Sequence, residues 1–491
     1  MNGPGTVYLV GGGPGNPGLL TVRGKELLQT ADVVVYDRLV GEEILSLIPP
    51  DAEKINVGKN AGCHPVAQEQ INQILLEQAR LGRRVVRLKG GDSFVFGRGG
   101  EELELLAQEH IPFEVVPGVT SAIAAPAFAG IPVTHRDYCS SVHIITGHRR
   151  QNGILSLDYE ALVRLKGTLV FLMSVSSLAE IAAGLQNAGM AGQTPCAVVE
   201  NGALPEQRKI VSALERVGID AQSAKVVSPA VFVVGGVCGL SDSFDWYSRL
   251  PLKGLRFLVT SPNPNASRMA EGLRKLGARV LLAPAIRTEP LAFRLPDFSR
   301  YTAVVFTSAA GVSAFWERLD ACGKDARVLA GTQIFCVGKE TAKALRACGI
   351  RADFVPSRYS GEFLAIELLE RRLVTSRDRV LLLRAETASP DLPRLLQGAG
   401  IPLEELTVYR AIEEEGAVPG PFDYAVFTSA SGVEHFCKRF NAVGGLSRIR
   451  ALCIGEQTAG AARLAGMTAD VSPVAAIDGM LAWIAETLGH Q

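Results

Sequence analysis

An internal repeat in the second half of the chain is the feature that most restricts its fold. Residues 303–315, AVVFTSAAGVSAF, recur as residues 424–436, YAVFTSASGVEHF, and residues 335–357 recur as residues 452–473. A third, weaker pair follows the same pattern, in which a β-branched run leads into a helix-like segment. Four such βα-type segments predict two similar lobes, and a cleft between lobes is a usual place for a ligand.

The same alternation of strand-like and helix-like segments runs through the whole chain. Short β-branched stretches that end in Gly, Asp or Asn, such as VYLVGG, DVVVYD and RVVRLKGG, alternate with amphipathic ones. This pattern predicts an α/β fold. Near residues 241–254 the sequence is polar, aromatic and proline-containing before the alternation restarts, so we place a linker at residues 246–253.

Several classes of protein are disfavoured by composition. The 491 residues carry equal numbers of basic and acidic side chains, which argues against a nucleic-acid-binding surface. The nine cysteines form no C-x-x-C pair or metal-ligand spacing, which is typical of reduced thiols in a cytosolic protein. No secretory signal is visible, and the longest apolar stretch, residues 168–185, contains Glu180. We therefore expect a cytoplasmic protein without a metal or a membrane span.

The glycine-rich segment of residues 7–24, VYLVGGGPGNPGLLTVRG, satisfies the G-x-G-x-x-G pattern of dinucleotide-binding enzymes. Such a loop presents backbone N–H groups to a pyrophosphate, yet Pro14 and Pro17 occupy two of its variable positions and have no N–H. A nicotinamide cofactor is therefore disfavoured. A tight strand-to-helix turn without any ligand is the simpler alternative on this motif alone.

Further glycine- and proline-rich loops follow other predicted strands of the first half. They are RLKGGDSFVFGRGGEE at residues 87–102, VVPGVTSAIAAPAFAGIPVTHRDY at residues 115–138 and VVENG at residues 198–202. The carboxyl ends of parallel strands meet at one edge of a sheet, and glycines there let the backbone approach a flat ligand. The sequence thus predicts a single site built from several loops.

These loops together resemble the tetrapyrrole methylase family, and within it the uroporphyrinogen-III C-methyltransferases. The resemblance covers about residues 5–245, with GGGPGNPGLLT, ADVVVYDRLV, VGKNAG, RLKGGDSFVFGRGGEE, VVPGVTSAIAAPAFAGIPVTHRDY, TLVFLM and VVENG in family order. Ser93 departs from the family, which usually has proline after GGD. The resemblance implies two α/β subdomains in a fold distinct from that of the Rossmann methyltransferases. It also implies a homodimer through this domain, which is the usual assembly of the family.

The resemblance also implies S-adenosylmethionine (SAM) as methyl donor, and it implies which residues surround it. Carried over by position, these residues are Pro14, Gly90, Gly91, Asp92, Val95, Thr120, Ser121, Met173, Gly202 and Ala230. The charge of Asp92 suits the ribose or the ammonium group. The shape and polarisability of Met173 suit the adenine or the thioether region.

The reaction implied by the family is methylation of uroporphyrinogen III at C2 and C7 to give precorrin-2. Asp37 and Lys59 match the family's proposed acid/base positions, although Asp37 equally suits a cap of the following helix and Lys59 a solvated charge. Basic residues in or beside the matched loops suit the carboxylates of the substrate, or alternatively helix-end charges. These residues are Arg38, Arg98, His135 and Arg136.

The repeated lobes of the second half resemble uroporphyrinogen-III synthase over about residues 253–485. The motifs are FLVTSPNPNASRMAEGLRKLGARVLLAPAI, VVFTSAAGV, CVGKETAKAL, VLLLRAE, LTVYRAI, VFTSASGV and CIGEQTAGAA. The resemblance implies two lobes joined by two strands, AIRTEPL and YRAIEEE. It places residues 254–288 and 412–491 in one lobe and residues 289–411 in the other. Ser261 stands where the family often has arginine.

Tyr409 is a candidate catalytic residue of this half because it belongs to one copy of the repeat only. Its counterpart is about Ile286, so a duplicated scaffold has one phenol in one place. Tyr409 suits a hydrogen bond to the hydroxyl that leaves hydroxymethylbilane, or alternatively packing at the hinge. Thr341, Ser429 and Thr458 in the repeated Gly-rich loops suit substrate binding, and the two threonines equally suit helix first turns.

The sequence therefore predicts a bifunctional enzyme with tetrapyrrole substrates, a methyltransferase at residues 1–245 and a synthase at residues 254–491. Two other classes stay open. One is a nicotinamide-dependent oxidoreductase that uses the first glycine loop. The other is a methyltransferase fused to a non-catalytic bilobed module that senses tetrapyrroles.

Overall fold

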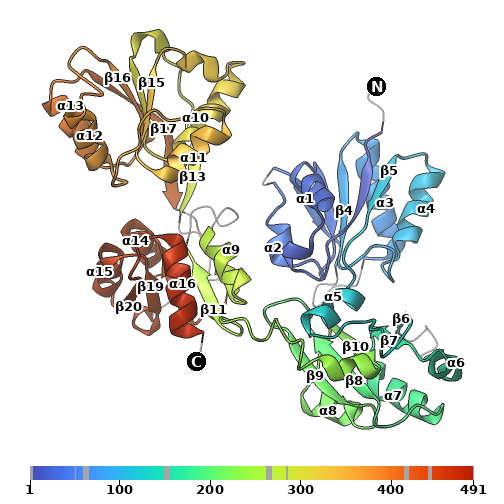
Figure 1. The fold of residues 1–491 in the computed structure, drawn as a ribbon. Coiled ribbons are helices and arrows are strands. Elements are labelled where there is room, and N and C mark those ends of the chain that lie inside the picture. The colour runs from blue at the N-terminus through green and yellow to red at the C-terminus, as the bar shows by residue number, and fades with distance from the viewer. Residues whose placement is uncertain are drawn as a thin grey trace. The chain divides into compact units, whose positions relative to one another are not determined.

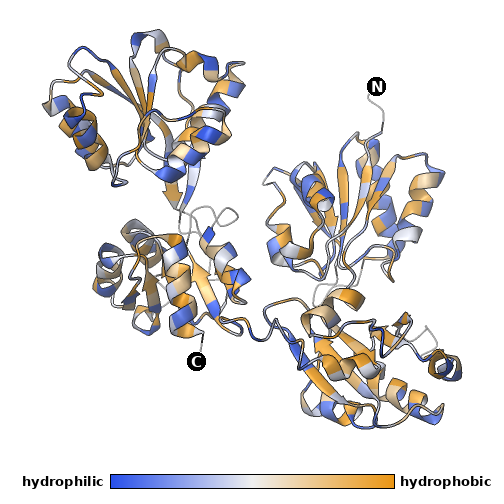
Figure 2. Cartoon of the chain, viewed as in Figure 1, coloured by the Kyte–Doolittle hydropathy of each residue, from blue (hydrophilic) through white to orange (hydrophobic). Residues whose placement is uncertain are grey.

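The protein is an α/β molecule with four five-stranded sheets, which confirms the predicted fold class (Figure 1). It is described from a computed structural model. The described residues are 4–49, 51–58, 66–148, 155–260, 268–283, 286–413, 420–440 and 445–489. In each sheet the strands carry mostly apolar side chains, while the helices alternate between apolar and polar faces (Figure 2).

The first sheet is wholly parallel, with strand order β3-β2-β4-β1-β5. Its elements are β1 (Val7–Gly11), α1 (Val22–Gln29), β2 (Val33–Tyr36), α2 (Glu42–Leu45), β3 (Glu53–Asn56), α3 (Gln68–Arg80), β4 (Val85–Lys89), α4 (Gly99–Gln108) and β5 (Phe113–Val116). Successive residues point to opposite faces: Val33 and Val35 join one buried cluster and Val34 another. Both faces are therefore buried, as is usual for a parallel sheet.

The second sheet is mixed, with strand order β6-β7-β10-β8-β9. Its elements are α5 (Ser121–Phe128), β6 (Val142–Thr146), α6 (Tyr159–Arg164), β7 (Thr168–Leu172), α7 (Leu178–Asn187), β8 (Pro195–Glu200), β9 (Arg208–Ala213), α8 (Val217–Ser223) and β10 (Ala230–Val234). β10 is antiparallel to both β7 and β8. The segment after β10 is packed: Tyr247 is buried, and the Trp246 indole N–H donates to the Ala127 carbonyl at 3.1 Å.

The third sheet has strand order β12-β11-β18-β19-β20 and draws on two separate stretches of the second half. Its elements are β11 (Arg256–Val259), α9 (Arg268–Lys275), β12 (Arg279–Leu282), β18 (Tyr424–Phe427), α14 (Ala430–Phe440), β19 (Arg450–Cys453), α15 (Glu456–Leu464), β20 (Thr468–Val471) and α16 (Ile477–Leu488). β18, β19 and β20 run parallel.

The fourth sheet has strand order β13-β17-β16-β14-β15. Its elements are β13 (Ile286–Pro290), β14 (Ala303–Phe306), α10 (Ala309–Ala321), β15 (Gln333–Cys336), α11 (Lys339–Ala347), α12 (Gly361–Glu370), β16 (Val380–Ala385), α13 (Asp391–Gly398) and β17 (Leu403–Glu413). β13 and β17 form an antiparallel pair, and the other pairings are parallel. The chain thus enters this sheet through β13 and leaves it through β17.

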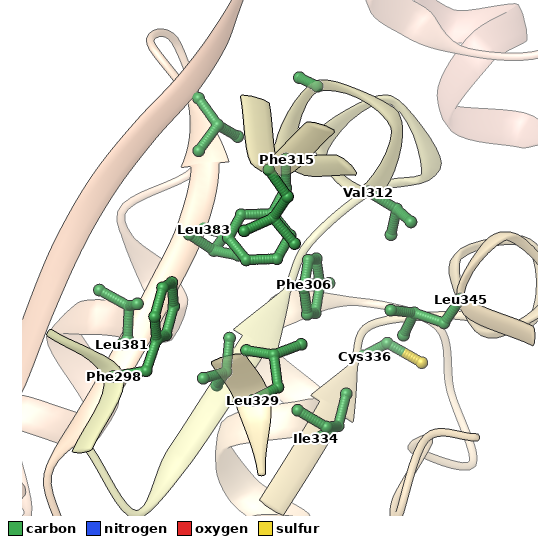
Figure 3. Close-up of a cluster of buried hydrophobic side chains, with 14 of the residues drawn as sticks. Phe298, Phe306, Val312, Phe315, Leu329, Ile334, Cys336, Leu345, Leu381 and Leu383 are labelled. Carbon is green, nitrogen blue, oxygen red and sulfur yellow. The ribbon is translucent and has the colours of Figure 1, made fainter. Parts of the chain in front are cut away.

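One face of the fourth sheet is covered by an aromatic and aliphatic core (Figure 3). Phe306 of β14 and Phe315 of α10 lie edge to face with ring centroids 5.5 Å apart. Leu381 and Leu383 of β16 join them, two residues apart and therefore on one face. This core fixes β14, α10 and β17, and β17 carries the candidate residue Tyr409.

Candidate active sites

Three glycine-rich loops of the first half meet at the carboxyl ends of β1, β4 and β5. Gly13 and Gly91 exchange two backbone hydrogen bonds of 3.1 and 2.7 Å. A Cβ atom on Gly118 would lie 2.2 Å from the Gly91 carbonyl oxygen, and one on Gly11 would lie 2.5 Å from the Gly118 Cα. Only glycine fits these positions, so their sequence spacing encodes the contact between the loops.

Asp92 joins two of these loops through its side chain. One carboxylate oxygen accepts from the Phe94 N–H at 2.8 Å, and the other accepts from the Gly118 N–H at 3.0 Å. Each carboxylate oxygen has a second lone pair, so Asp92 retains acceptor capacity for a ligand. The residue predicted as a ligand partner therefore also positions the backbone around the site.

Loops from the second sheet come close to those of the first. The Asn16 side-chain amide donates to the Ala203 carbonyl at 3.0 Å, across 187 residues of sequence. A Cβ atom on Gly202 would lie 2.2 Å from the Ala125 Cβ of α5. Thr120 caps α5, since its hydroxyl accepts from the Ala122 N–H at 3.3 Å. The structure thus brings the loops after β1, β4, β5 and β8 to one region.

The remaining predicted SAM residues lie in the same loops. Gly90 follows β4, and Val95 packs against the apolar cluster under α5. A Cβ atom on Gly91 would lie 4.0 Å from the Ser121 nitrogen. Ala230 begins β10 and pairs with Glu200, which lies two residues before Gly202. Pro14 directly follows Gly13, which pairs with Gly91.

A hollow of about 840 Å³ opens beside these loops. Its lining residues are Phe94, Phe96, Arg98, Gly99, Gly100, Glu101, Thr146, His148 and Met173. Phe96, Arg98 and Met173 have φ angles of 54°, 58° and 56°, a left-handed conformation that side chains with a Cβ seldom adopt. Such backbone strain clusters at functional sites. Phe94, Phe96 and His148 were not singled out from the sequence, where aromatic residues in a loop carry no clear signal.

The basic residues expected to bind substrate carboxylates are distributed unevenly. Arg98 lines the hollow, where its guanidinium forms two bonds to Glu101 of 2.9 and 2.6 Å. Arg38 is exposed beside Asp37. His135 and Arg136 lie in the loop after α5 and do not line this hollow, and the His135 Nδ1 accepts from the Asp137 N–H at 3.2 Å. The structure therefore brings only Arg98 of these four to the hollow.

A buried charge cluster lies beneath β4. Arg87 and Lys89 share the strand face of Val85, toward α3 and α4, and contact the Glu102 carboxylate at 3.1 and 2.6 Å. Glu102 is fully buried, and its Oε2 has no hydrogen-bond partner among the described residues. Burial, followed by repulsion from Arg87, lowers the pKa of Lys89. The sequence signal was two charges in an otherwise apolar strand, VVRLKGG.

This cluster extends to Asp37, the predicted acid/base residue. The Asp37 carboxylate lies 3.8 Å from the Arg87 guanidinium and accepts from the Leu39 N–H at 3.0 Å. The bond from Leu39 closes a turn at residues 37–39, whereas α2 begins only at Glu42, so Asp37 does not cap that helix. Lys59, the predicted partner of Asp37, lies outside the described residues.

The first glycine loop does not lead directly into an α-helix. A short 3₁₀ turn at Pro17–Leu19 follows it, and α1 begins only at Val22, capped by Thr21. A dinucleotide loop requires the helix N-terminus beside its glycines. The strand order also differs from the 3-2-1-4-5-6 order of that fold, because β1 lies between β4 and β5.

Tyr409 of the second half contacts a helix cap. The Ser308 hydroxyl donates to the Tyr409 phenol oxygen at 2.9 Å and accepts from the Gly311 N–H at 3.0 Å. Tyr409 also packs against the core drawn in Figure 3. The sequence singled out the tyrosine but not Ser308, which belongs to the repeated FTSA motif.

Ser429 and Thr458 line a second hollow of about 550 Å³, at the carboxyl ends of β18 and β19 of the third sheet. Its lining residues are Thr428, Ser429, Ala430, Ser431, Ile454, Gly455, Glu456, Gln457 and Thr458. Thr341 lies in α11, beside the fourth sheet, and is buried in the first turn, as Thr458 is in α15. The structure brings Ser429 and Thr458 together and places Thr341 elsewhere. Ser261 lies outside the described residues.

Within the described ranges, no group of three or more His, Cys, Asp or Glu is arranged to hold a metal ion. Among the helices that the structure describes, none has the length and apolar character required to cross a membrane.

Two family models match the chain, one in each half. Residues 6–218 match the model of Tetrapyrrole (Corrin/Porphyrin) Methylases, and residues 267–482 match that of Uroporphyrinogen-III synthase HemD.

Relatives cover either the whole chain or its first half. The Porphyrin biosynthesis protein HemD of Ruminiclostridium josui is 46% identical, over 97% of this chain and 97% of its own length. Siroheme synthase 2 of Serratia proteamaculans is 53% identical over 244 residues, which are 50% of this chain and 51% of that protein. The chain thus spans about half the length of this second relative.

A solved structure is also similar to the first half. The uroporphyrin-III C-methyl transferase of Thermus thermophilus, complexed with S-adenyl homocysteine, is 41% identical and covers 48% of this chain and 93% of its own, with a TM-score of 0.41. The two family models and the relative that matches along nearly the full length lead to one conclusion. The chain belongs to the family of porphyrin-biosynthesis proteins in which a tetrapyrrole methylase is fused to a uroporphyrinogen-III synthase.

Proposed function

We propose that the chain performs two consecutive reactions on tetrapyrroles. The second half cyclises hydroxymethylbilane to uroporphyrinogen III with inversion of ring D, and the first half methylates that product at C2 and C7 to give precorrin-2. The fusion of the two families in one chain is the observation that carries this proposal. We place the methyltransferase at residues 1–245, the linker at 246–253 and the synthase at 254–491, with residues 289–411 as one lobe and residues 254–288 and 412–491 as the other.

SAM is the methyl donor that we propose for the first half. The residues present fit a ligand of this kind, because a neutral backbone edge of glycines surrounds Asp92, whose charge suits a cationic group. The proposed contacts are Pro14, Gly90, Gly91, Asp92, Val95, Thr120, Ser121, Met173, Gly202 and Ala230. When bound, the group supplies an electrophilic methyl on a sulfonium.

The chain's own residues hold the substrate in place and provide a base. Because an electron-rich pyrrole carbon is already nucleophilic, holding the substrate in line with the methyl group accounts for most of the rate. Asp37 is the proposed base that takes the proton from the macrocycle, with Lys59 as its partner. The Arg87 guanidinium lies 3.8 Å from the Asp37 carboxylate and pairs with it. Arg98 in the hollow suits a peripheral carboxylate of the substrate.

In the second half we propose that hydroxyl groups direct the substrate. Tyr409 donates a hydrogen bond to the hydroxyl that leaves hydroxymethylbilane, while Ser429 and Thr458 hold carboxylates at the smaller hollow. Thr341 has the equivalent place in the fourth sheet. No metal is required for this step, and a homodimer through the methyltransferase half is the assembly we propose.

Separate assays test the two activities on the full chain. Incubation with hydroxymethylbilane alone is expected to give uroporphyrinogen III, whereas spontaneous closure gives the I isomer. Incubation of uroporphyrinogen III with SAM is expected to give precorrin-2. Formation of the I isomer alone, with methylation intact, would show that the second half is a non-catalytic binding module. Binding of NAD(P)H in place of SAM would support an oxidoreductase.

A further inference from the structure

Tyr409 lies immediately after a bulge in β17. Along the pairing with β16, Arg384 is opposite Thr407 but Ala385 is opposite Tyr409, so Val408 has no partner on that strand. The Tyr409 carbonyl then accepts from the Glu386 N–H at 2.9 Å, which restores the pairing. A bulge of this kind changes the direction of the side chains that follow it.

The bulge places two consecutive side chains on one side of the sheet. Val408 is a buried member of the core around Phe306, and Tyr409 packs against the same core. On a regular strand, successive residues point to opposite faces. The extra residue therefore turns Tyr409 toward α10 and the loop that precedes it.

Ser308 at the start of α10 determines what the phenol can donate to. Its single proton is given to the Tyr409 oxygen at 2.9 Å, and its own oxygen accepts from the Gly311 N–H. The Tyr409 oxygen is thus an acceptor in this contact, and the phenol proton points elsewhere. A hydroxyl that accepts a hydrogen bond is polarised and becomes a better donor.

The other copy of the repeat lacks this arrangement. Ser429, the counterpart of Ser308, keeps the cap by accepting from the Gly432 N–H at 3.1 Å, but its hydroxyl pairs with the Ser431 hydroxyl at 3.2 Å. Both serines therefore cap a helix, but among the described residues of the two repeat copies only Ser308 forms a hydrogen bond to a tyrosine hydroxyl.

We infer that Ser308 is a positioning residue of the synthase, which orients the Tyr409 hydroxyl so that its proton faces the substrate. The inference rests on the proposed synthase activity. Removal of the serine hydroxyl leaves the phenol free to rotate and to turn its proton away, without removing any group that contacts the substrate.

A double-mutant cycle on the full chain tests this role, with the rate of uroporphyrinogen III formation from hydroxymethylbilane as the readout. Ser308→Ala is expected to lower kcat by about three- to tenfold, the net value of one hydrogen bond, with little change in KM. Tyr409→Phe is expected to lower kcat at least as much. The double variant is expected to match Tyr409→Phe, because Ser308 acts through the phenol. Ser308→Thr, which keeps the hydroxyl, is expected to retain the rate.

Ser360→Ala is the matched control, because Ser360 caps α12 in the same half by accepting from the Phe363 N–H at 3.2 Å, and among the described residues its hydroxyl forms no hydrogen bond to a tyrosine. Ser360→Ala is expected to lower the free energy of unfolding about as much as Ser308→Ala and to leave kcat unchanged. A Ser308→Ala variant as active as Ser360→Ala, or losses that multiply in the double variant, would overturn the inference. A wild-type chain that forms no III isomer would instead overturn the proposed function.

Discussion

The two halves of the chain bury a glutamate in opposite ways. Glu102 in the methylase half is shared by two buried cations, Arg87 and Lys89, and one of its oxygens has no hydrogen-bond partner among the described residues. Glu367 in the synthase half accepts from the Ser357 N–H and hydroxyl, both at 2.7 Å, and pairs with the exposed Arg371 at 3.2 Å. Burial of the charges around Glu102 lowers the stability of the fold, and this cluster lies beside the proposed base Asp37. The hydrogen bonds of Glu367 are of an ordinary structural kind.

This difference follows the chemistry that we propose for each half. Methylation of a carbon requires removal of a proton, so a buried network that orients Asp37 has a use in the first half. Cyclisation of a flexible substrate requires orientation by neutral donors, and the second half provides Ser308, Tyr409, Ser429 and Thr458 near its loops. On this proposal, buried charge lies beside the candidate site of the first half, and hydroxyl groups lie at the candidate sites of the second.

Glu102→Ala is expected to have the largest effect on stability. It leaves Arg87 and Lys89 buried without their carboxylate, which costs about 3–5 kcal/mol of the free energy of unfolding. Hydrogen exchange of the β4 amides, monitored during denaturation, measures the change in the free energy of unfolding of the methylase half itself. Glu101→Ala is the control, since its ion pair with Arg98 is half-exposed and a surface ion pair contributes little to stability. Equal losses in the two variants would contradict the comparison.

Gly118→Ala is expected to weaken ligand binding in the methylase half. Its Cβ would lie 2.2 Å from the Gly91 carbonyl oxygen, so the two loops must separate. We expect the affinity for S-adenosylhomocysteine, measured by calorimetry, to fall about tenfold or more, which is ~1.4 kcal/mol. Gly239→Ala, where nothing lies within 4 Å of the added Cβ, is the control and is expected to bind normally. Unchanged affinity in Gly118→Ala would argue against a site at these loops.

Glu367→Gln is expected to have the smallest effect, and one that depends on pH. Bonds from Ser357 lower the pKa of Glu367 below its ordinary 4.5, so the ionised form stabilises the folded state. This contribution is complete above pH 4.5 and is lost as the pH falls through the lower pKa of the folded state. Denaturation of the wild type and Glu367→Gln between pH 3 and 6 is expected to give a shallower acid loss in the variant. Glu370→Gln, exposed on the same helix, serves as the control, and a wild-type slope in Glu367→Gln would contradict this account.

The sequence was informative where local pattern and spacing determine structure. The repeat predicted β14 with α10 and β18 with α14, and the glycines of three loops predicted that those loops converge. These features are local, since a β-branched run forms a strand and a glycine permits close backbone contact. The two prolines of the first loop likewise agree with the late start of α1 at Val22.

Features that depend on register or on distant partners were not predicted. The bulge at Val408 is set by pairing with β16, and the Ser308–Tyr409 bond joins residues 101 positions apart. The charges of Arg87 and Lys89 were visible, but their partner Glu102 is on a helix and is identified only by packing. Thr341 and Thr458 occupy equivalent repeat positions, yet their helices α11 and α15 lie beside different sheets because the chain passes from one sheet to the other.

Incubation of the purified full chain with hydroxymethylbilane and methyl-¹³C-labelled SAM tests the central claim most directly. The account predicts a single dipyrrocorphin product, precorrin-2, with two labelled methyl groups, at C2 and C7 of a type III ring. Unlabelled uroporphyrinogen I as the sole product, or a label on another carbon, would contradict it.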